Sequence, residues 1–268
     1  MRLPAAYATT GRAAAALPAL VLVFALGGSP AAHARPLDEI KSRGALSLCA
    51  NPNALPHASD KPDKPGFQIE IARAVAQRMG VTLTVEWIVP RMRASNVDCD
   101  MLLDTIAVAE IYGARVKLSI PYQRSGVALG VGPRASDVTS FADLKPGVRV
   151  GVMVNSVASV MLGKRELTTV PYAFEDEMVD DLASGKLDAA AVSPAPVGYY
   201  RHTHPDANIR LVYAYDDEPE LAWNVAIGLR RADDGFVEAV NRALGALLSD
   251  GTIARIYASY GIEHRPPK

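Results

Sequence analysis

The spacing of apolar residues changes several times along this chain, and each spacing predicts a different kind of element. Over residues 67–79 apolar side chains recur every three to four positions, which predicts a helix that ends at Gly80. Residues 81–87 alternate between apolar and polar side chains, which predicts a strand. Apolar runs over 45–49 and 99–106 predict two more strands. Strands that alternate with helices in this way indicate an α/β layer with a largely parallel sheet.

A second α/β region follows, and the end of the chain is expected to return to the first. The second region contains three predicted strands and four predicted helices: strands 148–153, 187–192 and 211–215, and helices 141–144, 155–162, 178–184 and one that starts at 194. The last part contains a predicted strand and two amphipathic helices: 223–229, 235–248 and 253–260. We therefore expect two lobes, residues 35–129 with 221–268 and residues 130–220, separated by a cleft of the kind that binds small molecules.

The first 34 residues have the pattern of a secretory signal peptide. They contain no Asp or Glu, and Arg2 and Arg12 precede an apolar run over 13–28 and an Ala-x-Ala sequence that ends at Ala34. The alternative, a membrane anchor, would need about 20 apolar residues without interruption. We expect cleavage after Ala34 and export of a soluble periplasmic protein, because no second apolar run is long enough to cross a bilayer.

Composition excludes several classes of protein. The sequence is 49% hydrophobic, which excludes a disordered chain, and its 2 Cys exclude a disulfide-dense miniprotein. Its net charge of −1 becomes −3 once the two arginines of the signal peptide are removed. This charge argues against a nucleic-acid binder that depends on a strongly basic surface.

Cys49 and Cys99 have two interpretations. Export to an oxidising compartment permits a disulfide between them, and the alternative is a pair of buried thiols. Cys49 ends one predicted strand and Cys99 lies at the start of another. If these strands are parallel neighbours, several residues of rise separate the two positions, whereas a disulfide needs Cα atoms within about 7 Å. Both interpretations remain open.

Several residues are candidates for contact with a ligand, each with a structural alternative. Phe67 either forms an aromatic wall of the cleft or packs in the core at the start of a helix. Thr105 ends a strand at the edge of the sheet where α/β proteins bind ligands. Arg91, with Arg93, either meets an anionic ligand or lies on the surface. Tyr122, Ser125 and Gly126 lie at the expected crossover between lobes, where they contact ligand or shape a hinge.

No pattern in the sequence predicts catalysis, a cofactor or a metal site. His202, His204 and Asp206 match no zinc signature and are interpreted as a polar loop. Nucleophile-elbow, Walker and HExxH sequences are absent. Trp223 is expected to pack inside the first lobe.

Four segments resemble the family 3 solute-binding proteins of ABC transporters, the periplasmic amino-acid-binding type. They are residues 236–262 with an Asp-Gly-Thr sequence between two helices, Leu182-x-x-Gly-x-x-Asp188-Ala, Pro121-Tyr122-x-x-Ser125-Gly126, and Phe141-x-Asp143-Leu144. The resemblance implies a two-lobed periplasmic binding protein fold of type II. In this fold each lobe is a mostly parallel sheet flanked by helices, and two crossover strands form the hinge. It also implies a monomer that delivers a small-molecule ligand to an ABC permease.

The sequence departs from this family where the amino-acid binders hold their ligand. Tyr112 stands where the family has an Arg that grips the carboxylate, and Ser193 stands where it has an Asp that pairs with the ammonium. Asn155-Ser156 replaces a Gly-Thr pair, although donors at Ser156 would still suit an anionic group. Because a zwitterion needs both charged partners, the resemblance implies a small polar or anionic ligand that is not a standard amino acid.

A narrower resemblance suggests an alternative role. The opening Cys49-Ala-Asn-Pro-Asn-Ala-Leu-Pro56 and the pair Cys99-Asp100 resemble the quinoprotein-dehydrogenase-associated solute-binding-like proteins of methylotrophs. Val192-Ser193 departs from the aromatic-Gly pair of that subset. This resemblance implies an accessory to a periplasmic PQQ-dependent alcohol dehydrogenase in methanol oxidation, without small-molecule transport. Dehydratase chemistry in the cleft is a third possibility, but no acid/base pair in the sequence supports it.

Overall fold

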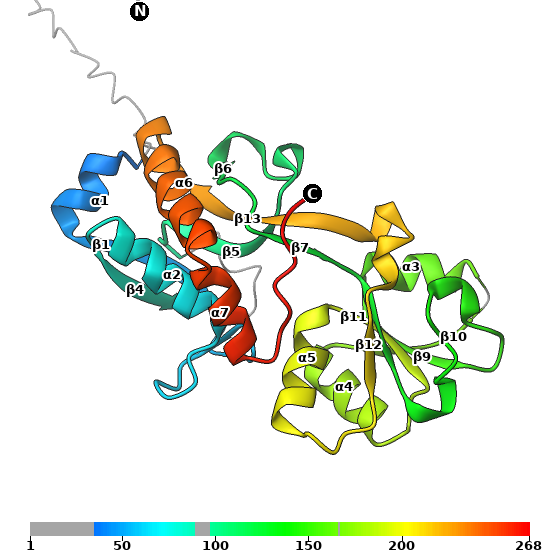
Figure 1. Ribbon diagram of the computed structural model, residues 1–268. Coiled ribbons are helices and arrows are strands. Elements are labelled where there is room, and N and C mark those ends of the chain that lie inside the picture. Colours follow the sequence, from blue (N-terminus) through cyan, green and yellow to red (C-terminus); the bar gives the residue numbers. More distant parts are fainter. Residues whose placement is uncertain (1–34, 89–96, 166) are drawn as a thin grey trace, which may run out of the picture. The chain divides into compact units, whose positions relative to one another are not determined.

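The structure is a computed structural model that describes residues 35–88, 97–165 and 167–268. Its first main sheet has the strand order β4-β1-β5-β13-β6, and β7 also pairs with β13 (Figure 1). The bounds are β1 Ala45–Ala50, β4 Thr82–Trp87, β5 Met101–Ile106, β6 Val116–Leu118, β7 Gln123–Gly126 and β13 Ala222–Arg230. Strand β1 runs parallel to β4 and β5, while β13 is antiparallel to β5, β6 and β7. This sheet and the helices on it are called lobe one.

The alternation of side chains along β1 separates the two faces of the lobe-one sheet. Leu46 and Leu48 are fully buried in the main hydrophobic core, where α2, α6 and α7 pack together. Ser47 and Cys49 alternate with them and therefore point to the opposite face. The helices of lobe one are α1 Leu37–Arg43, α2 Phe67–Arg78, α6 Asp234–Ser249 and α7 Thr252–Ser259.

Local sequence explains where two of these helices begin. Helix α6 begins after Asp233, whose carboxylate accepts a hydrogen bond from the Phe236 N–H at 2.7 Å. Helix α2 begins after Gly66, which has a φ of 91° and lies so close to His57 that a Cβ would approach its carbonyl oxygen at 2.5 Å. Glycine is therefore needed there, and it brings the loop that carries His57 against the start of α2. This loop contains the two short strands β2 Asn53–Ala54 and β3 Ala58–Ser59.

Lobe two is built on a five-stranded sheet that is covered on both faces. Its order is β10-β9-β11-β8-β12, with bounds β8 Ala128–Val131, β9 Arg149–Met153, β10 Thr168–Tyr172, β11 Ala189–Val192 and β12 Arg210–Val212. In β11, Ala189 and Ala191 belong to the hydrophobic cluster that includes α3, whereas Ala190 and Val192 belong to the cluster of α4 and α5. The helices are α3 Val157–Gly163, α4 Glu175–Ala183 and α5 Pro194–Thr203.

Two segments connect the sheets, as predicted for a two-lobed chain. Strand β7 leads into β8, and the chain returns through the first residues of β13, which pair with β7 from Ala222↔Gly126 to Val225↔Gln123. Gly126 has no space for a side chain, since a Cβ would lie 2.3 Å from the Leu221 carbonyl oxygen and 2.7 Å from the Tyr215 ring. Its place in the crossover is therefore explained by close packing of the two connections.

The C-terminal residues run along these connections. The Arg124 N–H donates to the Arg265 carbonyl oxygen at 2.7 Å, and the Arg265 N–H donates to Gln123 Oε1 at 3.1 Å. The Arg265 guanidinium lies 4.3 Å from the centroid of the Tyr213 ring and donates to Tyr215 Oη at 2.9 Å. The tail thus contacts β7 and the segment after β12 together.

The predicted elements differ from the structure in a few places. Strand β5 begins at Met101, two residues after the predicted start at 99, and the strand predicted over 211–215 ends at Val212. Ala214–Asp216 instead forms a 3-10 turn, as does the predicted helix at Phe141–Asp143. Seven of the described α-helices and strands were not predicted from the sequence: α1, β2, β3, β6, β7, β8 and β10. Strand β10 contains Pro171, which is tolerated because β10 lies at the edge of its sheet. Further 3-10 turns among the described residues are Ala109–Ile111, Gly113–Arg115, Pro133–Ala135 and Pro219–Leu221.

Within the described residues, none of the helices has the length and apolar character needed to cross a membrane.

Candidate functional site

A pocket of about 400 Å³ is lined by residues from both lobes. Lobe one contributes the end of β1, the loop around His57, the start of α2, the end of β5, and parts of β7, β13 and α7. Lobe two contributes Glu175 at the start of α4 and residues 193–195 at the start of α5. Strand ends and helix starts of α/β layers are the expected location of a binding site.

Asp104 provides a carboxylate from lobe one. It has a φ of 56°, and the pairing of β5 with β13 shifts register beside it, between Ala226 and Gly228. Its Oδ2 accepts a hydrogen bond from Gln68 Nε2 at 2.5 Å and lies 3.4 Å from His57 Nε2. All three side chains line the pocket. Asp104 is therefore held by two neighbours that take part in the same site.

Tyr122, one of the predicted site residues, supports Asp104 through a hydrogen bond to its backbone. It is fully buried, and its Oη accepts a hydrogen bond from the Asp104 N–H at 3.4 Å. Its carbonyl oxygen accepts from His264 Nε2 at 2.8 Å. Burial raises the pKa of Tyr122 and of neighbouring Tyr257 well above that of a free tyrosine, so both phenols are neutral. Tyr122 thus acts on the pocket through Asp104, because it does not itself line the cavity.

Glu175 provides a second carboxylate, from lobe two. It is the first residue of α4, and its Oε1 accepts hydrogen bonds from the Ser193 N–H at 2.9 Å and the Ser193 hydroxyl at 2.7 Å. Ser193 precedes α5 and also lines the pocket. Ser193, which was predicted from the sequence to bind the ligand, therefore lines the pocket, and its donors are directed to Glu175.

Aromatic side chains form part of the apolar lining. Phe67 is 2% exposed and packs in the main core, yet it also lines the pocket, so both interpretations of this residue apply. Its ring centroid lies 5.0 Å from that of His57 and 4.9 Å from that of Tyr257. Trp223 also lines the pocket, from β13 opposite Ser125, in addition to the predicted packing in lobe one.

Of the other predicted site residues in the described part of the chain, Ser125 is the one that lines the pocket. Thr105 is buried, and its hydroxyl donates to the Leu102 carbonyl oxygen. Tyr112 Oη accepts from the Ile106 N–H at 3.0 Å. Three further residues do not line the pocket: Gly126 in the connection, and Asn155 and Ser156 before α3. Arg91 lies outside the described residues.

The site residues predicted from the sequence did not include Asp104, Glu175, His57 or Gln68. Thr105, which was predicted to contact the ligand, is the residue after Asp104. The left-handed conformation of Asp104 changes which side chains of β5 reach the pocket. Glu175 begins a helix whose predicted start was three residues later, at 178. A search for acidic residues at the first turn of that helix would have identified it.

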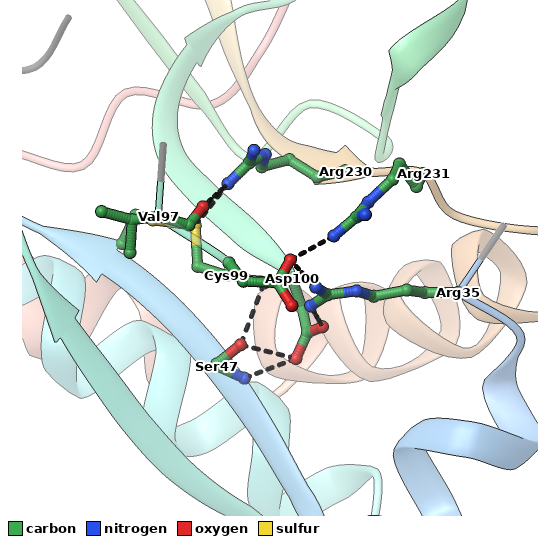
Figure 2. The surroundings of a disulfide bond; sticks show 9 residues. Arg35, Ser47, Val97, Cys99, Asp100, Arg230 and Arg231 are labelled. Atoms are coloured by element: carbon green, nitrogen blue, oxygen red, sulfur yellow. Dashed lines mark hydrogen bonds and ion pairs between the residues drawn. A yellow bond between two sulfur atoms is a disulfide. The ribbon is translucent and has the colours of Figure 1, made fainter. Parts of the chain in front are cut away.

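Cys49 and Cys99 form a disulfide, with their Cα atoms 5.5 Å apart (Figure 2). The expected separation along the strands does not arise, because β5 begins only at Met101, and Met101 pairs with Leu48. Cys99 lies before the strand and is free to reach Cys49. The bridge packs with Ile88 on the face of the lobe-one sheet opposite the helices, and Cys49 lines the pocket.

A buried carboxylate lies beside the disulfide. Asp100 is fully buried, and its Oδ2 accepts from the Ser47 N–H at 2.7 Å, from the Ser47 hydroxyl at 2.8 Å and from Arg43 at 2.5 Å. Its Oδ1 pairs with Arg35, which is also buried and contacts Asp98 as well (Figure 2). The Arg35 N–H donates to the Arg231 carbonyl oxygen at 2.5 Å. This network fixes the first described residue to β1 and to the ends of β5 and β13.

The described residues contain no group of three or more His, Cys, Asp or Glu side chains placed to hold a metal ion. His204 instead stacks on Tyr200 with ring centroids 4.2 Å apart.

Residues 46–263 match the family of bacterial extracellular solute-binding proteins, family 3. The chain belongs to this family. The match covers both lobes and the connections between them, and it agrees with the family that the sequence motifs indicated.

Curated relatives agree with this assignment. The chain is 24% identical over 211 residues to the lysine/arginine/ornithine-binding periplasmic protein of Escherichia coli K12, covering 75% of this chain and 80% of that one. It is also 24% identical to the histidine-binding periplasmic protein of Salmonella typhimurium, covering 73% and 78%. The membrane-bound lytic murein transglycosylase F of Serratia proteamaculans is 25% identical over 84% of this chain, which spans 47% of that enzyme. The matched relatives are thus mostly binding proteins.

Solved structures confirm the predicted fold. An ancestral cationic amino acid solute binding protein superposes with a TM-score of 0.71 at 22% identity, over 84% of this chain and 99% of that one. An ancestral arginine-binding protein bound to arginine gives a TM-score of 0.61 at 23% identity, over 81% and 98%. The fold is therefore the two-lobed α/β fold of periplasmic binding proteins, with partly parallel sheets flanked by helices.

Proposed function

We propose that this protein is a periplasmic solute-binding protein that closes its two lobes on a small polar ligand and does not catalyse a reaction. In this proposal residues 1–34 are a signal peptide cleaved after Ala34, and the lobes are residues 35–129 with 221–268 and residues 130–220. The mature chain is a monomer that delivers its ligand to an ABC permease. The observation that carries the proposal is a pocket with polar side chains from each lobe.

Contributions from both lobes matter because a ligand favours a closed state only through contacts that the open state lacks. Asp104, Gln68 and His57 would hold the ligand from lobe one, and Glu175 with Ser193 from lobe two. Ser125 and Trp223 lie on the paired strands β7 and β13, which would act as the hinge. Neither Tyr122 nor Gly126 would touch the ligand. Tyr122 would support Asp104, and Gly126 would allow the two connecting strands to pack closely.

The ligand is proposed not to be a standard amino acid. Arg and Lys are absent from the described residues that line the pocket, so these residues offer no bidentate grip for a ligand carboxylate. Tyr112, at the position of the carboxylate-gripping Arg implied by the resemblance, is engaged with the backbone of Ile106.

A thermal-shift screen of residues 35–268 against amino acids, organic acids and amines tests this proposal. We expect at least one compound to raise the melting temperature, because a ligand at 100 times its Kd stabilises the folded state by about 2.7 kcal/mol. Ser193→Leu, which would fill the pocket beside Glu175, should abolish the shift, and the exposed substitution Ser184→Leu should retain it. Stabilisation by none of these compounds would contradict the transport role.

An accessory role with a PQQ-dependent alcohol dehydrogenase in methanol oxidation is the second candidate. Exposed apolar side chains in lobe two favour it: Val154 is 48% exposed, Val157 54% and Phe174 60%. Val154 follows β9 and Phe174 follows β10, so both lie at the carboxyl end of the sheet, and Val157 begins α3. Exposed apolar patches are typical of protein-interaction surfaces.

A pull-down with the mature protein from periplasmic extract tests this second role. Capture of a quinoprotein dehydrogenase, lost in the double substitution Val157→Ser and Phe174→Ser, would support it. Capture that is unaffected by these substitutions, or capture of a permease complex instead, would contradict it.

A further inference from the structure

The pocket has an unbalanced set of charged groups. Among the described residues that line it, the charged side chains are Asp104, Glu175 and, when protonated, His57. The two carboxylates come from different lobes. The polar remainder consists of uncharged side chains: Asn51, Gln68, Gln123, Ser125 and Ser193. The charged groups of the described lining are therefore predominantly acidic.

Glu175 is held in place by two hydrogen bonds that it accepts from Ser193. Both donors of Ser193 are directed to its Oε1, at 2.9 and 2.7 Å. Glu175 is also the first residue of α4, where the helix dipole interacts favourably with a carboxylate. Glu175 thus places a negative charge at the lobe-two side of the pocket without needing a ligand to orient it.

The rest of the lining suits the body of an organic cation. Phe67 and Trp223 contribute aromatic surface, and aromatic faces attract ammonium groups as well as hydrocarbon chains. An anionic ligand would lie near two carboxylates. It would also lose its contacts with water, and no described Lys or Arg of the lining would compensate for that loss. The same reasoning disfavours the carboxylate end of a zwitterion.

We propose that this pocket selects organic ammonium cations that lack a carboxylate, and that Glu175 is the lobe-two residue that binds the ammonium group. The proposal rests on the proposed function, since it names the ligand class of the same pocket. From the sequence we expected a small polar or anionic ligand, and this proposal excludes the anionic alternative. Ser156, the expected anion donor, lies outside the pocket and accepts from the Ser159 N–H at 3.1 Å as the cap of α3.

Three compounds with a five-carbon chain separate the ligand classes in calorimetric titrations of residues 35–268. They are 1,5-diaminopentane, lysine, which adds a carboxylate to that diamine, and glutarate, which carries two carboxylates. We expect the diamine to bind at least tenfold more tightly than lysine, and glutarate not to bind. Tighter binding of lysine or glutarate than of the diamine would overturn the cation proposal while leaving the solute-binding role intact. Binding of none of the three, nor of any compound in the thermal screen, would overturn both.

Two matched variants assign the effect to Glu175. Glu175→Gln keeps an oxygen that accepts from Ser193 but removes the charge, so we expect diamine affinity to fall at least tenfold with an unchanged melting temperature of the free protein. Glu177→Gln makes the same change in the first turn of the same helix, at an exposed residue outside the pocket, and should leave affinity within twofold. Equal affinities for the two variants would refute the role of Glu175.

Discussion

Asp100→Asn is expected to destabilise lobe one by about 3–5 kcal/mol, as is typical when one partner of a buried ion pair is removed. The substitution leaves the buried Arg35 without its fully buried counterion. It also directs an amide N–H₂ at groups that donate to the carboxylate in the native protein, the Ser47 N–H among them. Urea denaturation followed by tryptophan fluorescence measures the effect in lobe one, because both tryptophans lie in β4 and β13.

The neighbouring Asp98 supplies the control for this experiment. It also pairs with Arg35, but its side chain is 75% exposed. Exposed ion pairs contribute only about 0–1 kcal/mol, so Asp98→Asn should change the unfolding free energy by less than 1 kcal/mol. If the two substitutions had equal effects, the buried network would not be what fixes Arg35 to the sheet.

Removal of the disulfide is expected to lower stability by about 2–4 kcal/mol. The bridge closes a loop with a sequence separation of 50, and constraining the unfolded chain stabilises the folded state by an amount that grows with loop length. In the double variant Cys49→Ala and Cys99→Ala, small apolar side chains replace two buried sulfurs, so no polar group is left without a partner. Denaturation in urea, with the fluorescence measurement described above, gives the difference.

Reduction of the native protein provides an independent comparison. Dithiothreitol should shift the urea midpoint of the native protein toward that of the double variant and should leave the variant unchanged. Thiol labelling confirms that the bridge has been reduced. If the reduced native protein then loses no stability, the disulfide does not stabilise the folded state as proposed.

Most of the fold could be predicted from sequence because the apolar spacing of each element agrees with its burial. Helix α6 is the clearest case, since Phe236, Val240, Ala243, Leu244 and Leu247 are all buried on one face, as expected. Elements that contain few apolar residues were not predicted, because they lack a recognisable apolar spacing. Strand β7 has the sequence Gln-Arg-Ser-Gly, and its pairing is set by β13, nearly 100 residues later in the chain.

The pocket was harder to predict than the fold because its chemistry depends on contacts between distant segments. Ser193 is separated from Glu175 by 18 residues, and His57 from Asp104 by 47. Asp104 lines the pocket and has a left-handed backbone conformation inside strand β5. This conformation could not be predicted from the sequence. Motif resemblance, in contrast, identified the family and drew attention to Ser193, which lines the pocket. Phe67, chosen for its aromatic ring at the start of a helix, lines the pocket as well.

Small-angle X-ray scattering of residues 35–268, alone and with each compound that raises the melting temperature, tests whether the two lobes close on a ligand. If the protein is a solute-binding protein whose lobes close on their ligand, a saturating compound will reduce the radius of gyration, and Glu175→Gln will need a higher concentration of an amine for the same reduction. An unchanged radius of gyration at saturation with every compound that binds would contradict closure of the two lobes around a ligand.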